Sequence, residues 1–479
     1  MVQRVEQSSQ EKRKWIYFFL IGEKIMLYKP NKLQLEDRLV GFSKNDVVQY
    51  ARTRYFEYLR HYNLSNFSGL LTTTYNNLVN DTFKNNDYLN KSKVDNLLNK
   101  IDFELDKECQ KIVKQYNIKY DRPTLYCLVG IPGSGKSHLA EEIKQNCESS
   151  DLHRETIIVS SDKIREEYNL SPKNQKDNSK TFEIYYNIIK QSLKEGKNVI
   201  CDALNINIKD RQYLFNAVKN IDCEKQCYIK IKSIPQCIIE DSYRCRKEKV
   251  GCSVIQSQVR KFQIPFYNEG WDNIVLSYRK DDVKSVLNNR FDDNGCANTY
   301  FKQMLDTEQN NPHHNETVGN HSLTALKLWN NNYSDKYNID YDIAVKYHDV
   351  GKLFTQITDE NDISHFYNHE KFGTYLMLEN INFFTQLIRQ NHPINHVFNT
   401  NLTQKEAENI FLKQLFLVNY HMMPFAWEKQ PRRYDKDFKL FGKDNVELLK
   451  DFNECDRFRE KDLIINNSLS LDEEFIKDM

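Results

Sequence analysis

A glycine-rich segment followed by lysine and serine is the part of the chain best suited to chemistry. Residues 130–137 read GIPGSGKS, the pattern G-x-x-x-x-G-K-S, after the apolar run 125–129 and before a predicted helix from His138 to Lys144. Glycines let consecutive backbone N–H groups point inward, and the helix start adds unpaired donors and partial positive charge. We predict that ATP binds through Gly130, Gly133, Ser134, Gly135, Lys136 and Ser137. Lys136 would reach the outer phosphates, and the Ser137 hydroxyl would complete the coordination of Mg²⁺.

Two further polar segments follow predicted strands. SSDKIR, with Asp162 and Arg165, comes after the predicted strand 157–159, and CDALN, residues 201–205, comes at the end of the predicted strand 198–201. A predicted helix at 183–194 and a fourth predicted strand at 227–231 complete a strand–helix alternation, which favours a parallel sheet. We predict that Asp162 begins a helix as its N-cap. Active sites of such sheets lie at the carboxyl ends of the strands.

These three segments together resemble the 5′-OH polynucleotide kinases of phages and bacteria. The later stretch through Arg244, Arg246 and EGWDNI at 269–274 adds to the resemblance, which covers residues 120–280. It implies that Asp162 is the general base on the acceptor hydroxyl and that Arg165 contacts an acceptor phosphate. Arg244 and Arg246 would belong to a lid over the donor phosphates. The family lid has R-x-x-x-R before Val-Pro, whereas this chain has R-C-R and Val250-Gly251, so either arginine is a candidate.

The expected chemistry of this part is phosphoryl transfer, which needs mainly in-line positioning and charge neutralisation. A carboxylate within reach of the attacking hydroxyl contributes roughly 10²–10⁴-fold. The Asp162–Arg165 spacing favours an acceptor that itself carries phosphate over a sugar or an antibiotic.

Histidine and aspartate recur in five ordered segments of the C-terminal part. The segments are NPHHNETVGNH at 311–321, YHDVGK at 347–352, HFYNHEKFG at 365–373, NYHMMPF at 419–425 and FNECDR at 452–457. One His-Asp pair is expected roughly once by chance in a chain with 12 histidines. The ordered series, however, resembles the metal-dependent HD phosphohydrolase superfamily over residues 296–460.

The HD resemblance implies a set of metal ligands by position. One divalent metal would be held by His321, His348, Asp349 and Asp456. A second metal, or a substrate phosphate, would meet His369 and His421, with Asp349 bridging. Imidazole mixed with carboxylate suits Mn²⁺, Ni²⁺, Co²⁺, Fe²⁺ or Zn²⁺ more than Mg²⁺ alone. Such a metal lowers the pKa of a bound water from about 15.7 towards about 7.

Other polar residues of this part have weaker assignments. Lys352 would contact a substrate phosphate, and His313 and His314 would either do likewise or cap a helix. Three histidines are expected outside the ligand set: His365, His392 and His396.

Length and composition bound the organisation. A prior of about 150 residues per domain divides 479 residues into three units. We expect a mostly helical module at 1–115, an α/β kinase at 116–285 and an all-helical unit at 296–479, with a linker at 280–298. The formal charge of +1 means that a nucleic-acid site must be a local patch. Eleven cysteines without a C-x-x-C pair indicate reduced thiols in a cytoplasmic protein.

The first 115 residues carry no recognised motif. We predict a hairpin at 15–27, helices at 47–62 and 94–116, and loops at 63–90. The segment 15–27 is too short and too charged to span a membrane, so no membrane partner is expected. Basic residues among aromatics could dock nucleic acid, or simply form a solvated face: Arg52, Arg54, Arg60 and His61. The abundant Asn, Lys and Tyr are typical of AT-rich coding, as in many phages.

The two resemblances together imply the healing of broken nucleic-acid ends, with RNA or tRNA favoured over DNA. A kinase would phosphorylate the 5′-OH, and a phosphohydrolase would remove a 2′,3′-cyclic, 2′- or 3′-phosphate. A separate RNA ligase would then be a partner, because no K-x-D-G adenylation motif is present. Two alternatives stay open: a nucleoside or metabolite kinase fused to a nucleotidase, and a nucleotide-sensing regulatory or defence protein with an HD effector.

Overall fold

The computed structural model describes most of the chain from Lys91 onward and short pieces before it. The described residues are 42–43, 62, 64, 80–81, 83, 88–89, 91–116, 122–149, 154–245, 249–279, 281–283, 297–311, 316–337, 339–391 and 402–458. The hairpin predicted at 15–27 and the helix predicted at 47–62, apart from Tyr62, lie outside this part, as do the basic residues within that helix. The helix predicted at 94–116 is α4 (Lys91–Tyr116). The two-residue strands β1 (Phe42–Ser43) and β2 (Tyr88–Leu89) pair antiparallel.

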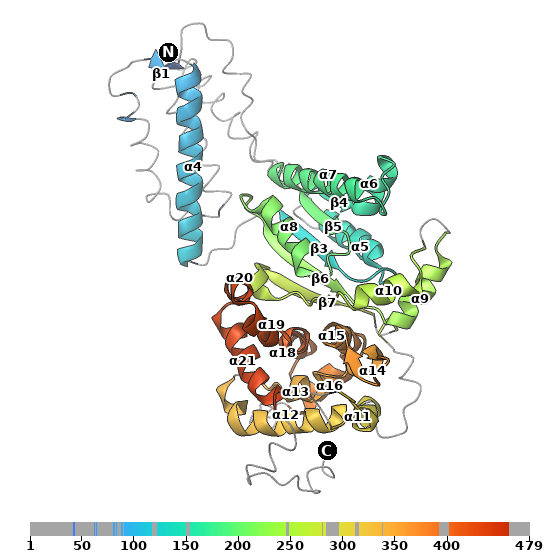
Figure 1. Cartoon of the computed structure of the whole chain (residues 1–479). Coiled ribbons are helices and arrows are strands. Elements are labelled where there is room, and N and C mark those ends of the chain that lie inside the picture. The colour runs from blue at the N-terminus through green and yellow to red at the C-terminus, as the bar shows by residue number, and fades with distance from the viewer. Residues whose placement is uncertain are drawn as a thin grey trace, which may run out of the picture.

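A five-stranded parallel sheet is the centre of the described structure (Figure 1). Its strands are β3 (Thr124–Val129), β4 (Thr156–Ser160), β5 (Asn198–Asp202), β6 (Glu224–Lys230) and β7 (Asn273–Ser277), in the order β4-β5-β3-β6-β7. All neighbouring strands of this sheet run parallel, which confirms the predicted α/β class. β7 was not expected as a strand, and β6 begins three residues before the prediction because its first residues are polar and half-buried.

Helices cover both faces of the sheet, so its strands read as apolar runs. On one face α5 (Lys136–Glu148) packs Leu139 and Ile143 against Leu128 of β3. On the other face α7 (Gln175–Lys194) and α8 (Ile208–Val218) contribute Tyr185 and Leu214 to the core. α7 begins eight residues before the predicted start because the Asn174 side chain caps it by accepting from the Lys176 N–H. The remaining helices of this part are α6 (Ser161–Glu167), α9 (Ile234–Tyr243), α10 (Cys252–Val259) and the 3₁₀ turn η3 (Tyr267–Glu269).

The chain from Ala297 to Phe458 forms a helical region beneath the sheet in Figure 1. Its elements are α11 (Ala297–Asp306), α12 (Val318–Asn332), η5 (Ser334–Lys336), α13 (Asp342–Tyr347), α14 (Lys352–Thr355), α15 (His369–Glu379), α16 (Ile381–Asn391), α18 (Gln404–Tyr420), α19 (Met423–Lys429), α20 (Pro431–Phe441) and α21 (Lys443–Asp456). The region is not all-helical as expected, because β8 (Gln356–Thr358) and β9 (Ser364–Phe366) form an antiparallel pair before α15.

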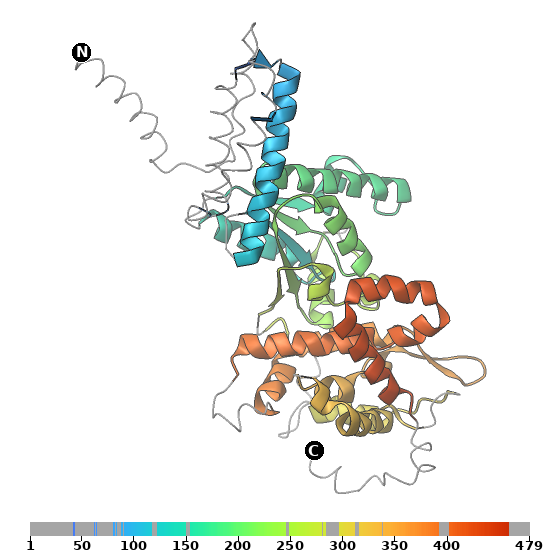
Figure 2. The same cartoon turned by 90° about the vertical axis from the view of Figure 1, so that its left-hand side faces the viewer.

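The sheet domain and the helical region share one hydrophobic core rather than meeting through a linker. The chain after α10 packs against the ends of α18 and α20, where the ring of Phe266 lies 5.1 Å from that of Phe416 and 5.2 Å from that of Phe441. Figure 2 shows the helical region directly below the edge of the sheet. Most of the predicted linker lies outside the described residues, but Val283 within it is buried.

Candidate functional site

The glycine-rich loop connects β3 to α5, as the sequence motif requires. Gly133 and Gly135 have φ angles of 81° and 91°, which favour glycine. A Cβ on Gly130 would lie 2.7 Å from Ser134 Oγ and 2.9 Å from the Lys230 carbonyl oxygen, so this position has no room for a side chain. Ser134 Oγ is buried without a hydrogen-bond partner, which leaves a polar atom at the loop for a ligand. These features fit a phosphate cradle.

Lys136 and Ser137 begin α5 beneath this loop. Lys136 Nζ donates a 3.0 Å hydrogen bond to the Ile131 carbonyl, and burial lowers the pKa of the ammonium while Asp202 opposes that shift. Ser137 Oγ donates to Asp202 Oδ2 at 2.8 Å. The donor set of hydroxyl and carboxylate oxygens fits Mg²⁺, which prefers oxygen ligands.

Asp202 is a candidate site residue that the sequence reasoning did not assign. It ends β5, which pairs with β3, and parallel pairing brings its carboxylate beside the first turn of α5. Burial raises the pKa of Asp202, although Lys136 and Ser137 oppose the shift. The sequence did contain a signal for this position, because an aspartate ends the buried strand that lies next to the phosphate loop.

Asp162 and Arg165 lie on α6, directly after β4. The N-cap of α6 is Ser160, so the prediction that Asp162 is the N-cap is wrong; Asp162 is the second helical residue and its side chain is 89% exposed. Arg165 donates to Asp162 Oδ1 at 2.7 Å and to Asn178 Oδ1 at 3.1 Å, and its guanidinium lies over the Phe182 ring. The pair is therefore held together at the strand end with its carboxylate open to solvent.

The predicted lid begins where α9 ends. Arg244 follows α9 directly and lies 3.9 Å from Asp241 Oδ1, with its side chain 39% exposed. Asp241 is buried and also accepts hydrogen bonds from the backbone N–H groups of Val250 and Gly251. These bonds hold the start of α10 against the end of α9. Arg246 lies outside the described residues.

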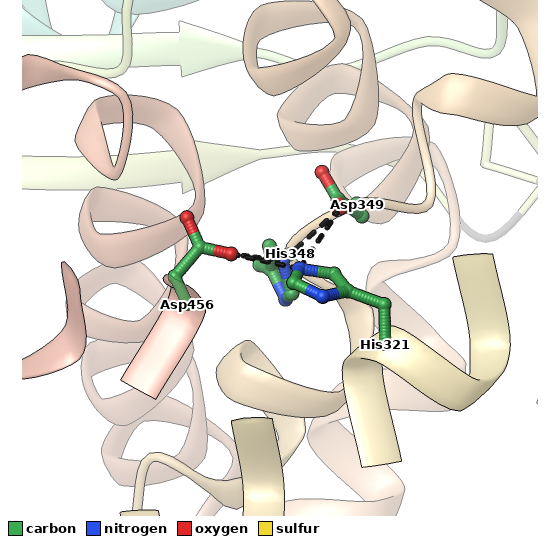
Figure 3. Close-up of side chains that lie close together, drawn as sticks. All are labelled: His321, His348, Asp349 and Asp456. Carbon is green, nitrogen blue, oxygen red and sulfur yellow. Dashed lines mark hydrogen bonds and ion pairs between the residues drawn. The ribbon is translucent and has the colours of Figure 1, made fainter. Parts of the chain in front are cut away.

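Four histidines and two aspartates of the helical region converge on one buried cluster. Figure 3 shows His321 from α12 and Asp456 from α21 meeting His348 and Asp349, which follow α13. His369 begins α15, and the remaining histidine caps the end of α18. They form two groups of ligand atoms, each within 4.8 Å, that share Asp349: His321, His348, Asp349 and Asp456, and Asp349, His369 and His421.

Distances within the cluster are those of groups that face one another. His321 Nε2 lies 2.9 Å and His348 Nε2 lies 3.1 Å from Asp456 Oδ1. Asp349 Oδ2 lies 3.2 Å from His348 Nε2, and Asp349 Oδ1 lies 3.0 Å from His369 Nε2. Despite these distances, His348 Nε2 is buried without a hydrogen bond of acceptable geometry.

The backbone fixes the tautomer of three of these histidines. In each, Nδ1–H donates a 2.8 Å hydrogen bond to the carbonyl oxygen three residues earlier: His348 to Val345, His369 to Phe366, and His421 to Val418. Nε2 is then the nitrogen that faces the carboxylates, and it is the atom that would bind a metal once it has lost any proton it carries. His321 Nδ1 lies 3.4 Å from Glu316 Oε1, a carboxylate outside the predicted set. The orphaned Nε2 of His348 and this donor set fit a divalent transition metal.

The charged groups of the cluster shift one another's pKa values. Burial opposes the ionisation of Asp349, but Lys352 and His348 hold its pKa well below the usual value. Burial likewise opposes protonation of His348, yet Asp349 and Asp456 raise its pKa to about 10. Burial, with His348 and His369 nearby, lowers the pKa of His421 to about 4. Protons thus concentrate beside the two carboxylates, where a cation would compete with them.

The other predicted residues of this region have different positions. Lys352 Nζ lies 2.6 Å from Asp349 Oδ2 and donates to Gln309 Oε1 at 2.8 Å, so it contacts the cluster. His365 lies outside the cluster and pairs with Asp359 at 3.0 Å. Four further histidines lie outside the residues that the structure describes: His313, His314, His392 and His396.

Comparison with known proteins supports the kinase assignment of the sheet domain. Residues 125–265 match the family described as an AAA domain. No curated protein matches the chain. The fold, the phosphate loop and the family match together make this part a P-loop kinase domain.

Similar solved structures include kinases of several kinds. A chain of the Pnkp1/Rnl/Hen1 RNA repair complex is 22% identical with a TM-score of 0.27, over 30% of this chain and 46% of that chain. The APS kinase CysC of Mycobacterium tuberculosis is 14% identical with a TM-score of 0.27, over 34% and 92%. A gluconokinase of Sinorhizobium meliloti is 18% identical with a TM-score of 0.23, over 32% and 81%. This chain thus spans less than half of the repair-complex chain, and likenesses this low do not distinguish a polynucleotide acceptor from a small one.

Two further observations bear on the sequence predictions. Each cysteine in the described part is a free thiol. Among the described residues, no helix combines the length and apolarity that crossing a membrane requires.

Proposed function

We propose that this protein heals nucleic-acid ends, with an ATP-dependent 5′-OH polynucleotide kinase at 116–285 and a metal-dependent HD-type phosphohydrolase at 296–479. The observation that supports the proposal is that two groups of side chains suited to phosphate chemistry lie on one shared core. One is the phosphate loop with the open Asp162–Arg165 pair at the neighbouring strand end. The other is the buried cluster of four histidines and two aspartates.

In the kinase half, the acceptor end would meet α6. Asp162 would orient the 5′-hydroxyl and accept its proton, and Arg165, already fixed by Asn178 and Phe182, would bind the adjacent phosphate. Lys136 would move from the Ile131 carbonyl to the outer phosphates of ATP. Ser137 and Asp202 would hold Mg²⁺, which would neutralise phosphate charge. Arg244, at the end of α9, would cover the donor phosphates.

In the helical region, the residues would bind and orient a terminal phosphate. The six cluster side chains would hold one or two divalent metals, which supply a water of lowered pKa. Lys352 would bind a phosphate oxygen from its position between Asp349 and Gln309. The substrate would be a 2′,3′-cyclic, 2′- or 3′-phosphate, and RNA, tRNA included, is favoured over DNA. Healed ends are the substrates of a separate RNA ligase.

The test follows both ends of one substrate. An RNA oligonucleotide with a 5′-OH and a 2′,3′-cyclic phosphate is incubated with γ-labelled ATP, Mg²⁺ and Mn²⁺. We expect label at the 5′ end and loss of the 3′-side phosphate. Asp162→Asn should slow only the labelling of the 5′ end, by roughly 10²–10⁴-fold. Asp349→Ala should abolish only the loss of the 3′-side phosphate.

Each contrary outcome removes a defined part of the proposal. Label on free nucleosides but not on RNA or DNA would replace it with a small-molecule kinase. Bound nucleotide without transfer to either acceptor would indicate a sensor. Full phosphohydrolase activity in Asp349→Ala would exclude the cluster as its site.

A further inference from the structure

Helix α9 is the element that connects the phosphate loop to the lid. The carbonyl oxygen of Cys237 on α9 would lie only 2.4 Å from a Cβ on Gly133, so α9 packs directly on the loop backbone. The same helix ends at Tyr243, and Arg244 is the next residue. Its position therefore sets both the shape of the loop and the starting point of the lid.

The beginning of α9 lacks a cap from its own domain. Ser233 is the N-cap residue, but its side chain makes no capping hydrogen bond, and its Oγ is buried without a partner. The second helical residue is Pro235, which has no N–H to donate. The N–H of Ile234 is thus the group at this helix start that most needs an acceptor, since burying it unpaired is costly.

That acceptor comes from the helical region. Ile234 N–H donates to Glu379 Oε2 at 2.8 Å across 145 residues of sequence. Glu379 is the last residue of α15 and is 3% exposed. From the same helix, the buried hydroxyl of Tyr375 donates to the Lys232 carbonyl at 2.9 Å, just before α9. A carboxylate at a helix N-terminus is favoured by the helix dipole as well as by the hydrogen bond.

We propose that Glu379 is a positioning residue of the kinase, which caps α9 from the helical region and thereby fixes the phosphate loop and Arg244 for ATP binding. The helical region is then a part of the nucleotide site and not only the carrier of a second activity. Glu379 itself does not touch ATP. Its effect reaches the nucleotide through α9.

The test measures ATP–Mg²⁺ binding by calorimetry on the full chain, which needs no acceptor and so stands apart from the polynucleotide proposal. Glu379→Ala removes the acceptor for Ile234 N–H. Glu379→Gln keeps a carbonyl oxygen there, and because burial raises the pKa of Glu379 to about 7, a neutral acceptor suits the site. Tyr420→Phe is the matched control: it deletes a buried hydroxyl that donates to the Ile264 carbonyl in the same interface, away from α9.

We expect Glu379→Ala to raise the Kd for ATP about tenfold, as loss of one buried acceptor implies. Glu379→Gln and Tyr420→Phe should stay within about twofold of the wild type. The thermal midpoint of each variant is measured alongside. Unchanged ATP affinity in Glu379→Ala overturns the proposal. Equal weakening in Tyr420→Phe overturns it as well, because the effect would then be general loosening of the interface.

Discussion

Asp202 and Asp349 are both buried carboxylates, but their surroundings shift their pKa values in opposite directions. Burial dominates at Asp202 and raises its pKa, whereas Lys352 and His348 overcome burial at Asp349 and hold its pKa well below the usual value. Asp349 consequently stays ionised down to acid pH and is ready for a cation. Asp202 takes up a proton at a higher pH than an ordinary aspartate.

Replacing Asp202 tests its assignment at the magnesium position. Asp202→Asn keeps an oxygen for the Ser137 hydroxyl but removes the charge, and we expect the kinase kcat to fall about 100-fold. The wild-type rate should also decline as pH falls and Asp202 becomes protonated, because the ionised form is the one that attracts Mg²⁺. The pH profile of kcat for both proteins is the measurement. A fully active variant would remove Asp202 from the site.

At the scale of elements, a close approach of Gly351 and Gly373 positions the histidine–aspartate cluster. Gly351 follows the His348–Asp349 pair, and a Cβ there would lie 2.0 Å from the His369 carbonyl oxygen and 2.6 Å from the Gly373 nitrogen. The loop that carries His348 and Asp349 therefore rests directly on the first turn of α15, which carries His369. Residue 351 must be glycine because of this close contact and not because of its backbone angle, since a φ of −67° is open to any residue.

The variant Gly351→Ala should separate these two elements. We expect a loss of about 1–3 kcal/mol in the free energy of unfolding, as overpacking of a tight contact costs. Metal content per folded molecule should fall with it. Urea unfolding and elemental analysis of the purified protein check the two effects. Wild-type metal content in the variant would mean that the cluster does not depend on this contact.

The contact between α9 and α15 should make the free energy of unfolding depend on pH. Burial raises the pKa of Glu379 to about 7, so the folded state binds a proton more tightly than the unfolded chain does. Stability from this group is then greatest at acid pH and is lost as pH rises from about 4.5 through about 7. Relative to Glu379→Gln, the wild type should lose up to roughly 3 kcal/mol between pH 5 and pH 8. Urea midpoints at both values measure this, and parallel pH dependence of the two proteins would contradict it.

At the scale of the molecule, the continuous core joins the two halves that the sequence suggested as separate units. Because Phe266 packs among Phe416, Tyr420 and Phe441, neither half completes its core alone. We expect calorimetry to show one main unfolding transition for the kinase and helical regions. Both ATP–Mg²⁺ and Mn²⁺ should raise its midpoint, since each binds the same folded state. Two resolved transitions, each shifted by one ligand, would show independent domains.

Sequence predicted those features that local chemistry displays. The phosphate loop and its flanking strand were readable because the motif fixes both, and the ordered histidine segments named the side chains that the structure brings together, although their metal stays a prediction. β7 was missed because its apolar run is short and lies between the polar residues Asn273 and Ser277. The Asp162 cap was wrong because the helix already begins at Ser161, so that its N-cap is Ser160. Glu379 had no signal, because a capping partner 145 residues away follows no local pattern.

The interface between the sheet domain and the helical region also has a consequence for synthesis on the ribosome. Ile264 N–H is satisfied by Asn419, which is translated 155 residues later. At roughly 5 to 20 residues per second, about 8 to 30 seconds pass between the synthesis of Ile264 and that of Asn419. During that interval the nascent chain presents the apolar side chains of Phe262 and Phe266 to solvent. We expect chaperones that hold exposed apolar segments to engage the chain at this stage and to release it once α18 arrives.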